Sequence, residues 1–229
     1  MTSSIKLICG PTNDEQLLSI SIPENDNPLN TILVGFTGGI DSSFMLYLLV
    51  KLNSEQHIPY IIQPITINSF NGSVDSPIVE QWHYIPKIIQ FLRIKTHQLI
   101  NHSKFLLGNS NLSGNVQLVQ GLVSLLKNKD NKLLFLGDTV HPPNLTVSYV
   151  RTWSTHEQIV QPFSNLNKSH IIDAMIKLDL EDLINIAPRC PIYHKYSNSP
   201  CDNFFCTERR WAYSALNRTD LLQRFLLTG

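Results

Sequence analysis

Apolar and polar positions alternate in blocks along most of this 229-residue chain. Short apolar runs rich in Ile, Leu and Val are typical of strands that are buried on both faces of a sheet, and the stretches between them carry apolar residues at helical spacing. From residue 31 the predicted order is strand 31–36, helix 41–53, strand 60–67, helix 75–91, strand 95–100, helix 112–127 and strand 132–136. Strands that alternate with helices predict an α/β fold with a doubly wound parallel sheet.

The two ends of the chain depart from this pattern. Residues 1–30 hold one short predicted strand, 5–8, and a polar turn between Pro23 and Pro28. After residue 150 the spacing predicts helices over 167–178, 180–184 and 206–227, with a loop rich in Cys, Pro and Asn before the last. We therefore expect an N-terminal strand and linker (1–30), an α/β domain (31–150) and a C-terminal helical region (151–229).

The junction between the first strand and the first helix of the α/β domain is the most informative segment. It reads Phe36-Thr37-Gly38-Gly39-Ile40-Asp41-Ser42-Ser43. Adjacent glycines let the backbone turn sharply and approach a ligand closely. The first N–H groups of the following helix lack intrahelical partners, so a phosphate fits beside them. In such sheets ligands bind beyond the carboxyl ends of the strands, so loops 37–43, 68–74 and 137–144 are expected to meet at one site.

Other phosphate-binding and hydrolase motifs are absent from the sequence. It has no Gly-Lys pair for a P-loop, its glycines lack dinucleotide-binding spacing, and it contains neither G-x-S-x-G nor H-E-x-x-H. The segment resembles the Ser-Gly-Gly-x-Asp-Ser signature of the PP-loop ATP pyrophosphatases, with Thr37 in place of the first Ser. This resemblance implies an HUP-type (adenine nucleotide alpha hydrolase-like) fold that binds ATP with Mg²⁺ and cleaves it between the α- and β-phosphates, giving an adenylylated substrate.

This interpretation gives the residues of the loop distinct tasks. Gly38 and Gly39 would wrap the pyrophosphate, and Ser42 and Ser43 would donate hydrogen bonds to it. Asp41 would hold Mg²⁺ or cap the loop through backbone N–H groups. A Gly-Gly turn followed by an ordinary helix-capping Asp is the structural alternative. The expected nucleotide-binding residues are Phe36, Thr37, Gly38, Gly39, Asp41, Ser42 and Ser43.

The C-terminal loop and the helix after it hold three of the four cysteines: Cys190, Cys201 and Cys206. In a reducing compartment such crowding favours a metal site over disulfides. Structural Zn²⁺ takes four ligands, and His194 in the same loop is the most economical fourth, with Asp202 and Cys9 as alternatives. Three buried cysteines without a metal are the other interpretation. A closed shell of four ligands would make the zinc structural, stapling the C-terminal region.

The same region resembles the 7-cyano-7-deazaguanine synthases, a PP-loop family that makes the queuosine precursor. Their ending, a first Cys followed after a variable loop by Pro-Cys-Gly-x-Cys-x-x-Cys-x-x-Arg, is matched in part by Cys190, Pro200-Cys201-Asp202 and Cys206-Thr207-Glu208-Arg209. The resemblance covers about residues 31–216. The chain lacks the third cysteine of the motif, and it departs from the family at 68–72 and 142–145, which border the family's substrate pocket. The resemblance implies adenylation of a 7-deazapurine carboxylate, followed by attack of ammonia to form a nitrile.

Four residues are expected to carry the catalysis: Asp41, Lys168, Asp138 and Arg209. Lys168 opens a predicted helix, as a Lys does in the resembling family, and would neutralise phosphate or a substrate carboxylate. Asp138 follows a strand at its carboxyl end, and Arg209 is placed like the family's Arg. A solvated Lys and an ordinary turn Asp are the alternatives.

Charge and composition limit the expected partners. The 18 basic and 18 acidic residues balance, so nothing suggests a broad nucleic-acid footprint. No apolar run is long enough to span a membrane, and the start does not resemble a signal peptide, so we expect a cytoplasmic protein. The expected partners are a small-molecule substrate and ammonia, with a homodimer possible. A PP-loop enzyme that adenylates a tRNA base for thiolation or amidation is one alternative. A non-catalytic nucleotide-binding or zinc-stapled interaction protein is another.

Overall fold

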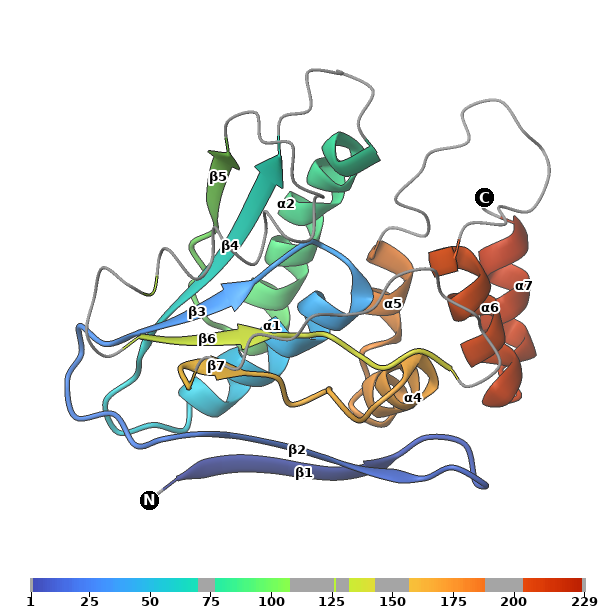
Figure 1. Ribbon diagram of the computed structural model, residues 1–229, viewed down its shortest axis with the longest axis horizontal. Helices are drawn as coiled ribbons and strands as arrows, with labels where there is room; N and C mark the ends of the chain where they lie inside the picture. The colour runs from blue at the N-terminus through green and yellow to red at the C-terminus, as the bar shows by residue number, and fades with distance from the viewer. Residues whose placement is uncertain are drawn as a thin grey trace.

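The computed structural model describes residues 2–69, 77–107, 126, 132–142, 157–187 and 204–227. Its main sheet has five parallel strands in the order β5-β4-β3-β6-β7 (Figure 1). The strands are β3 (Thr31–Gly35), β4 (Ile61–Ser69), β5 (Ser103–Leu107), β6 (Lys132–Leu136) and β7 (Ile159–Val160). The predicted parallel α/β sheet is therefore confirmed.

Strand β3 carries apolar side chains on both of its faces. Ile32 and Val34 belong to the larger hydrophobic core, which includes helix α1 (Ile40–Asn53), whereas Leu33 belongs to a second cluster with Leu134 and Leu136 of β6. Successive strand residues point to opposite faces, so the unbroken apolar run of β3 reflects burial on both sides. The predicted helix 112–127 lies outside the described residues except for Leu126, which is helical, buried and part of the second cluster.

Helix α2 (Pro77–Thr96) is longer than predicted, and it occupies part of the segment expected to be a strand at 95–100. That strand prediction is wrong. The chain leaves the helix at His97, whose φ is 54°, and β5 begins only at Ser103. The guanidinium of Arg93 donates to the carbonyl of Ile100 (2.6 Å), which holds the connecting turn against the helix end. The side chain of Leu99 is 79% exposed, so the apolar residues of 95–100 do not indicate a buried strand.

Four helices follow the sheet in the C-terminal part. Helices α4 (Lys168–Lys177) and α5 (Glu181–Ile186) confirm two predictions. The single helix predicted over 206–227 is wrong, because α6 (Phe204–Ala215) and α7 (Thr219–Leu227) are separated by a turn. Asn217 in this turn has φ 54°, the left-handed conformation that commonly ends a helix. Figure 1 shows these four helices at the end of the molecule toward which β3 and β6 point.

The N-terminal residues form an antiparallel hairpin apart from the main sheet. Strand β1 (Ser3–Cys9) contains the predicted strand 5–8, and β2 (Gln16–Ile22) was not predicted. Buried and exposed side chains alternate along β2: Leu18 and Ile20 are buried, and Leu17, the residue before Leu18, is exposed. The buried face packs against α1 and α4 along the lower side of Figure 1.

One hydrophobic core joins the hairpin, the sheet and the C-terminal helices. It includes Leu18 of the hairpin, Phe44 of α1, Phe163 before α4 and Tyr213 of α6. The rings of Phe44 and Phe163 are stacked with centroids 5.7 Å apart. Helices α4 and α6 are thus fixed in place beyond the carboxyl ends of β3 and β6. Among the described helices, none combines the length and apolarity needed to cross a bilayer.

Candidate functional site

The strand order of the main sheet reverses between β3 and β6. The chain leaves β3 through α1 and returns in β4 on one side of β3, whereas β6 pairs with its other side. In open α/β sheets, ligands bind beyond the carboxyl ends of the strands at such a reversal. The Gly38-Gly39 segment directly follows β3, so the structure brings the sequence motif to this point.

The loop after β3 is held by its own hydrogen bonds. Gly38 has φ 79°, a conformation that disfavours any side chain. The hydroxyl of Ser42 accepts from the Thr37 N–H (3.2 Å) and donates to the Gly39 carbonyl (3.2 Å). Ser42 thus stabilises the conformation of the loop. Gly39 is the N-cap of α1 and offers no side-chain cap, so the first N–H groups of the helix remain available to an anion.

Phe36 and Ser43 lie deeper than the rest of the loop. The Phe36 side chain is buried, its N–H donates to the Ile65 carbonyl (2.8 Å), and its carbonyl accepts from the hydroxyl of Thr66. Ser43 is fully buried in α1. Any contact of the predicted segment with a ligand is therefore made mainly by Thr37 to Asp41.

The loop after β6 packs closely against the beginning of α1. A Cβ on Gly137 would lie 2.8 Å from the Asp41 carbonyl oxygen, closer than a side chain allows. Asp138 follows at half-buried depth, and the N–H of Val140 donates to the carbonyl of Leu166 (2.8 Å), which precedes α4. The loop after β6 therefore connects the start of α1 with the start of α4.

Lys168 and Asp41, two of the predicted catalytic residues, form an ion pair across this junction. Lys168 is the first residue of α4 and is buried. A cation at a helix N-terminus is repelled by the helix dipole, and burial of its charge adds a desolvation cost. Both costs must be offset by nearby anions. Lys168 is therefore not the solvated lysine of the alternative interpretation.

Glu208 supplies the second carboxylate and was not predicted as a site residue. It lies on α6 with its side chain 2% exposed, its Oε2 is 3.7 Å from the Lys168 Nζ, and its Oε1 is 3.9 Å from Nδ1 of His141. The ring of His141 meets the Phe204 ring edge-on at 4.8 Å. The only sequence signal for Glu208 was its helical register with Ala212, which places a charged residue on the buried face of α6.

Arg209 is buried on the same helix and faces neighbouring backbone. Its guanidinium donates to the hydroxyl of Tyr213 (2.8 Å) and to the carbonyls of Ile184 and Ala187 in and after α5. These contacts satisfy the carbonyls at the end of α5 and tie α6 to it. These contacts of Arg209 join α6 to α5, whereas Glu208 beside it contacts the Lys168 ammonium.

Buried oxygens at the junction include some without a hydrogen-bond partner. Among the described residues they include Oδ1 of Asp41, the Ser43 hydroxyl and the Thr139 hydroxyl. Hard oxygen atoms, a carboxylate above all, are the ligands that Mg²⁺ takes in proteins. The Asp41 carboxylate therefore fits a magnesium ion bound together with a nucleotide.

The predicted zinc site falls mostly outside the described residues. Cys190, His194 and Cys201 lie there, and Cys206 is buried on α6. Within the part of the chain that the structure describes, no group of His, Cys, Asp or Glu side chains is arranged to hold a metal. Burial raises the pKa of the Cys9 thiol to about 11, and the thiol donates to the Gln16 carbonyl at 3.7 Å.

Comparison with known proteins adds little to this description. No family model matches the chain, and no curated protein sequence matches it. Among solved structures, the U34-tRNA thiolase NcsA from Methanococcus maripaludis with its [4Fe-4S] cluster is similar at a TM-score of 0.42 and 14% identity, over 88% of this chain and 67% of that one. A likeness of this extent assigns the chain neither a family nor a function.

Proposed function

We propose that the protein binds ATP with Mg²⁺ at the Gly38-Gly39 loop and transfers AMP to an acceptor, releasing pyrophosphate. The observation that carries this proposal is the position of the loop. It lies at the reversal of strand order and leads into the uncapped start of α1, whose first turn holds Asp41 in an ion pair with Lys168. Backbone N–H groups and one buried cation meeting at a single point suit a polyphosphate.

The chain's own residues divide the work of such a reaction. The N–H groups at the start of α1 bind the departing pyrophosphate, and Lys168 stabilises the charge that develops on it. Asp41 would hold Mg²⁺, which neutralises phosphate oxygens when bound. Gly137 lets the loop after β6 approach α1, so the acceptor side of the site is built by Asp138 and the residues after it.

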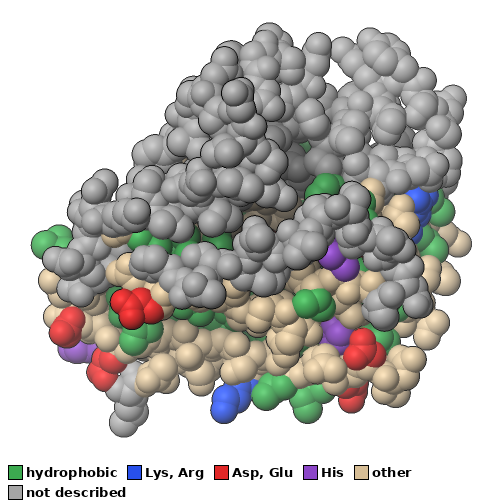
Figure 2. Space-filling view, in the orientation of Figure 1, with side chains coloured by type: hydrophobic (Ala, Val, Ile, Leu, Met, Phe, Trp, Pro, Cys, Tyr) green, Lys and Arg blue, Asp and Glu red, His purple; other side chains and the backbone are tan. Residues whose placement is uncertain are grey.

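We propose a 7-deazapurine carboxylate as the acceptor, with ammonia as the second nucleophile. The carboxylate attacks the α-phosphorus of ATP, pyrophosphate leaves, and ammonia then displaces AMP from the adenylate to give an amide. The amide oxygen would attack a second ATP in the same way, and loss of AMP with its oxygen would give the nitrile. The support for this acceptor is the sequence resemblance in the C-terminal region. On the described part of the face shown in Figure 2, Lys and Arg side chains do not gather into a patch, which agrees with a small acceptor.

The test is pyrophosphate release from ATP and Mg²⁺ with 7-carboxy-7-deazaguanine and ammonium, in the presence and absence of tRNA. We expect release that needs the deazapurine and is unaffected by tRNA. Lys168→Ala should lower the rate by at least about tenfold, because one charge-assisted contact is lost. The matched control Lys95→Ala, at the exposed end of α2, should leave the rate unchanged. Release that needs tRNA, with salt-sensitive tRNA binding, would instead identify a tRNA-modifying enzyme.

The zinc site remains a prediction of the sequence. We propose that Cys190, His194, Cys201 and Cys206 hold one structural Zn²⁺. Metal analysis of the purified chain should find zinc, and Cys201→Ser should remove it. A chain that carries no zinc, or that retains it in Cys201→Ser, would contradict this ligand set.

A further inference from the structure

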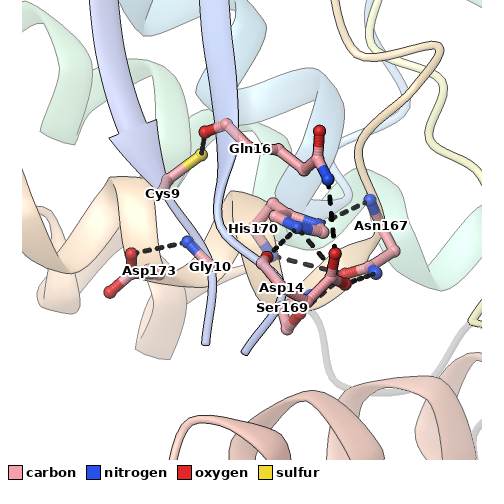
Figure 3. A network of polar contacts seen from close by, with 8 residues as sticks. All are labelled: Cys9, Gly10, Asp14, Gln16, Asn167, Ser169, His170 and Asp173. Carbon is pink, nitrogen blue, oxygen red and sulfur yellow. Dashed lines mark hydrogen bonds and ion pairs between the residues drawn. The ribbon is translucent and has the colours of Figure 1, made fainter. Parts of the chain in front are cut away.

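The turn between β1 and β2 lies against α4, the helix that begins with Lys168 (Figure 3). The Gly10 N–H donates to Oδ2 of Asp173 (2.8 Å), and the carbonyl of Asp14 is 2.7 Å from Nε2 of His170. Lys177, one turn after Asp173, donates to the Ile8 carbonyl (3.1 Å). These bonds join residues more than 150 positions apart in the sequence, so they fix the hairpin relative to α4.

His170 connects this turn to the first turn of the helix. Its Nδ1 accepts from the Asn167 N–H (3.1 Å), while its Nε2 faces the Asp14 carbonyl, which only accepts. The two bonds together require a neutral ring with its proton on Nε2. The Asn167 side chain in turn accepts from the N–H groups of Ser169 (3.0 Å) and His170 (3.4 Å). One imidazole thus completes the capping box of α4 and ties that box to the hairpin.

Gly10 leaves no free space between the turn and the imidazole. Its φ is +116°, and a Cβ there would lie 2.4 Å from Cδ2 of His170 and 2.5 Å from the Asp14 carbonyl oxygen. The His170 ring is therefore held on one side by backbone alone, and it cannot shift toward the hairpin without moving the turn.

We infer that the β1–β2 turn is a positioning device for Lys168, acting through His170 and the Asn167 cap. Asn167 is the N-cap and Lys168 the next residue, so any rotation or fraying of this first turn displaces the ammonium from Asp41. The polar contacts of the turn described above are with α4, so they act on Lys168 through that helix. The importance of this placement for catalysis rests on the proposed function.

The substitution His170→Gln separates the hairpin link from the cap. Gln is a usual third residue of a capping box, so its side chain should still accept from the Asn167 N–H. Its shape differs from that of an imidazole, so it should not keep the contact with the Asp14 carbonyl. We expect acetic anhydride to label Lys168 several-fold faster in His170→Gln than in the natural chain, as measured by mass spectrometry, with Lys87 on α2 as the internal reference. The affinity for ATP with Mg²⁺ should fall about tenfold, and this loss should vanish when Lys168 is already Ala.

Lys6→Ala, on the exposed face of β1, is the matched hairpin control and should behave like the natural chain in both assays. Asp173→Ala, which breaks the bond to Gly10, should act like His170→Gln and replaces it if that variant does not fold. Natural labelling of Lys168 in both variants would overturn the inference, as would an equal loss of affinity in the Lys168→Ala background. If the natural chain bound no ATP, the proposed function would fail, and the labelling alone would still test the positioning.

Discussion

Asp41 is the residue on which the site depends most directly. It stands in the first turn of α1, pairs with Lys168, and has a buried oxygen without a hydrogen-bond partner among the described residues. We predict that Asp41→Asn abolishes pyrophosphate release. The chain should stay folded, because the Glu208 carboxylate still faces the Lys168 ammonium. The free energy of unfolding should fall by about 1–2 kcal/mol, less than for a fully buried pair.

Urea denaturation and the release assay measure these two effects separately. Asp26→Asn, in the loop before β3, is the control and should alter neither quantity. Turnover that survives in Asp41→Asn would remove Asp41 from the chemistry.

Replacing two glycines at the junction by alanine should lower the stability of the fold by different amounts. At Gly39 the added Cβ meets only the Thr37 hydroxyl at 3.4 Å, an ordinary contact, and φ is −73°. Gly39→Ala should therefore cost less than about 1 kcal/mol of stability, yet weaken ATP binding because the methyl group lies on the helix start. Gly137→Ala must move the Asp41 backbone and should cost about 1–3 kcal/mol. Thermal melts and nucleotide titrations of both variants check the contrast, and equal destabilisation of the two would contradict it.

At the scale of single elements, we predict that the start of α7 makes the stability of the fold depend on pH. Hydrogen bonds from the Arg218 guanidinium to Asp220 lower the pKa of that carboxyl from 3.8 to about 2. The pKa of the folded state is the lower one, so this stabilisation is fully present above about pH 4 and is lost as the pH falls toward 2. The Asp220 side chain is 46% exposed, so solvent screening limits the contribution to about 0.5 kcal/mol.

Urea denaturation of the natural chain and of Asp220→Asn checks this assignment. The variant should be less stable at pH 6 and equal to the natural chain near pH 2. A difference that persists unchanged at pH 2 would contradict the role of the ion pair.

Elements were predictable from the sequence where local pattern and burial agree. β6 was predicted at its observed bounds, because its apolar run is too short for a typical helix and is ended by Gly137. β2 was missed, since Leu17 beside Leu18 hides the alternation of buried and exposed positions. The false strand at 95–100 had the opposite cause: Leu99 is apolar but exposed. The break at Asn217 depends on one left-handed residue, which a helical periodicity does not reveal.

At the scale of the whole molecule, the site combines local and distant parts. The loop after β3 and its place beyond a strand end were predictable, because a Gly-Gly turn between an apolar run and a helix is a local signal. Its pairing with Lys168 was expected only as a shared site. Glu208 and the hairpin turn could not be found from sequence spacing, since their approach to α4 is set by the packing of the common core.

The central claim is that the segment after β3 binds the phosphates of ATP. Isothermal titration calorimetry of the full chain with ATP and Mg²⁺ tests it most directly, with Gly39→Ala and Lys95→Ala measured alongside. We predict saturable binding to the natural chain, equal affinity in Lys95→Ala, and an affinity at least about tenfold weaker in Gly39→Ala. The absence of binding to the natural chain, or the same affinity in all three proteins, would contradict the claim.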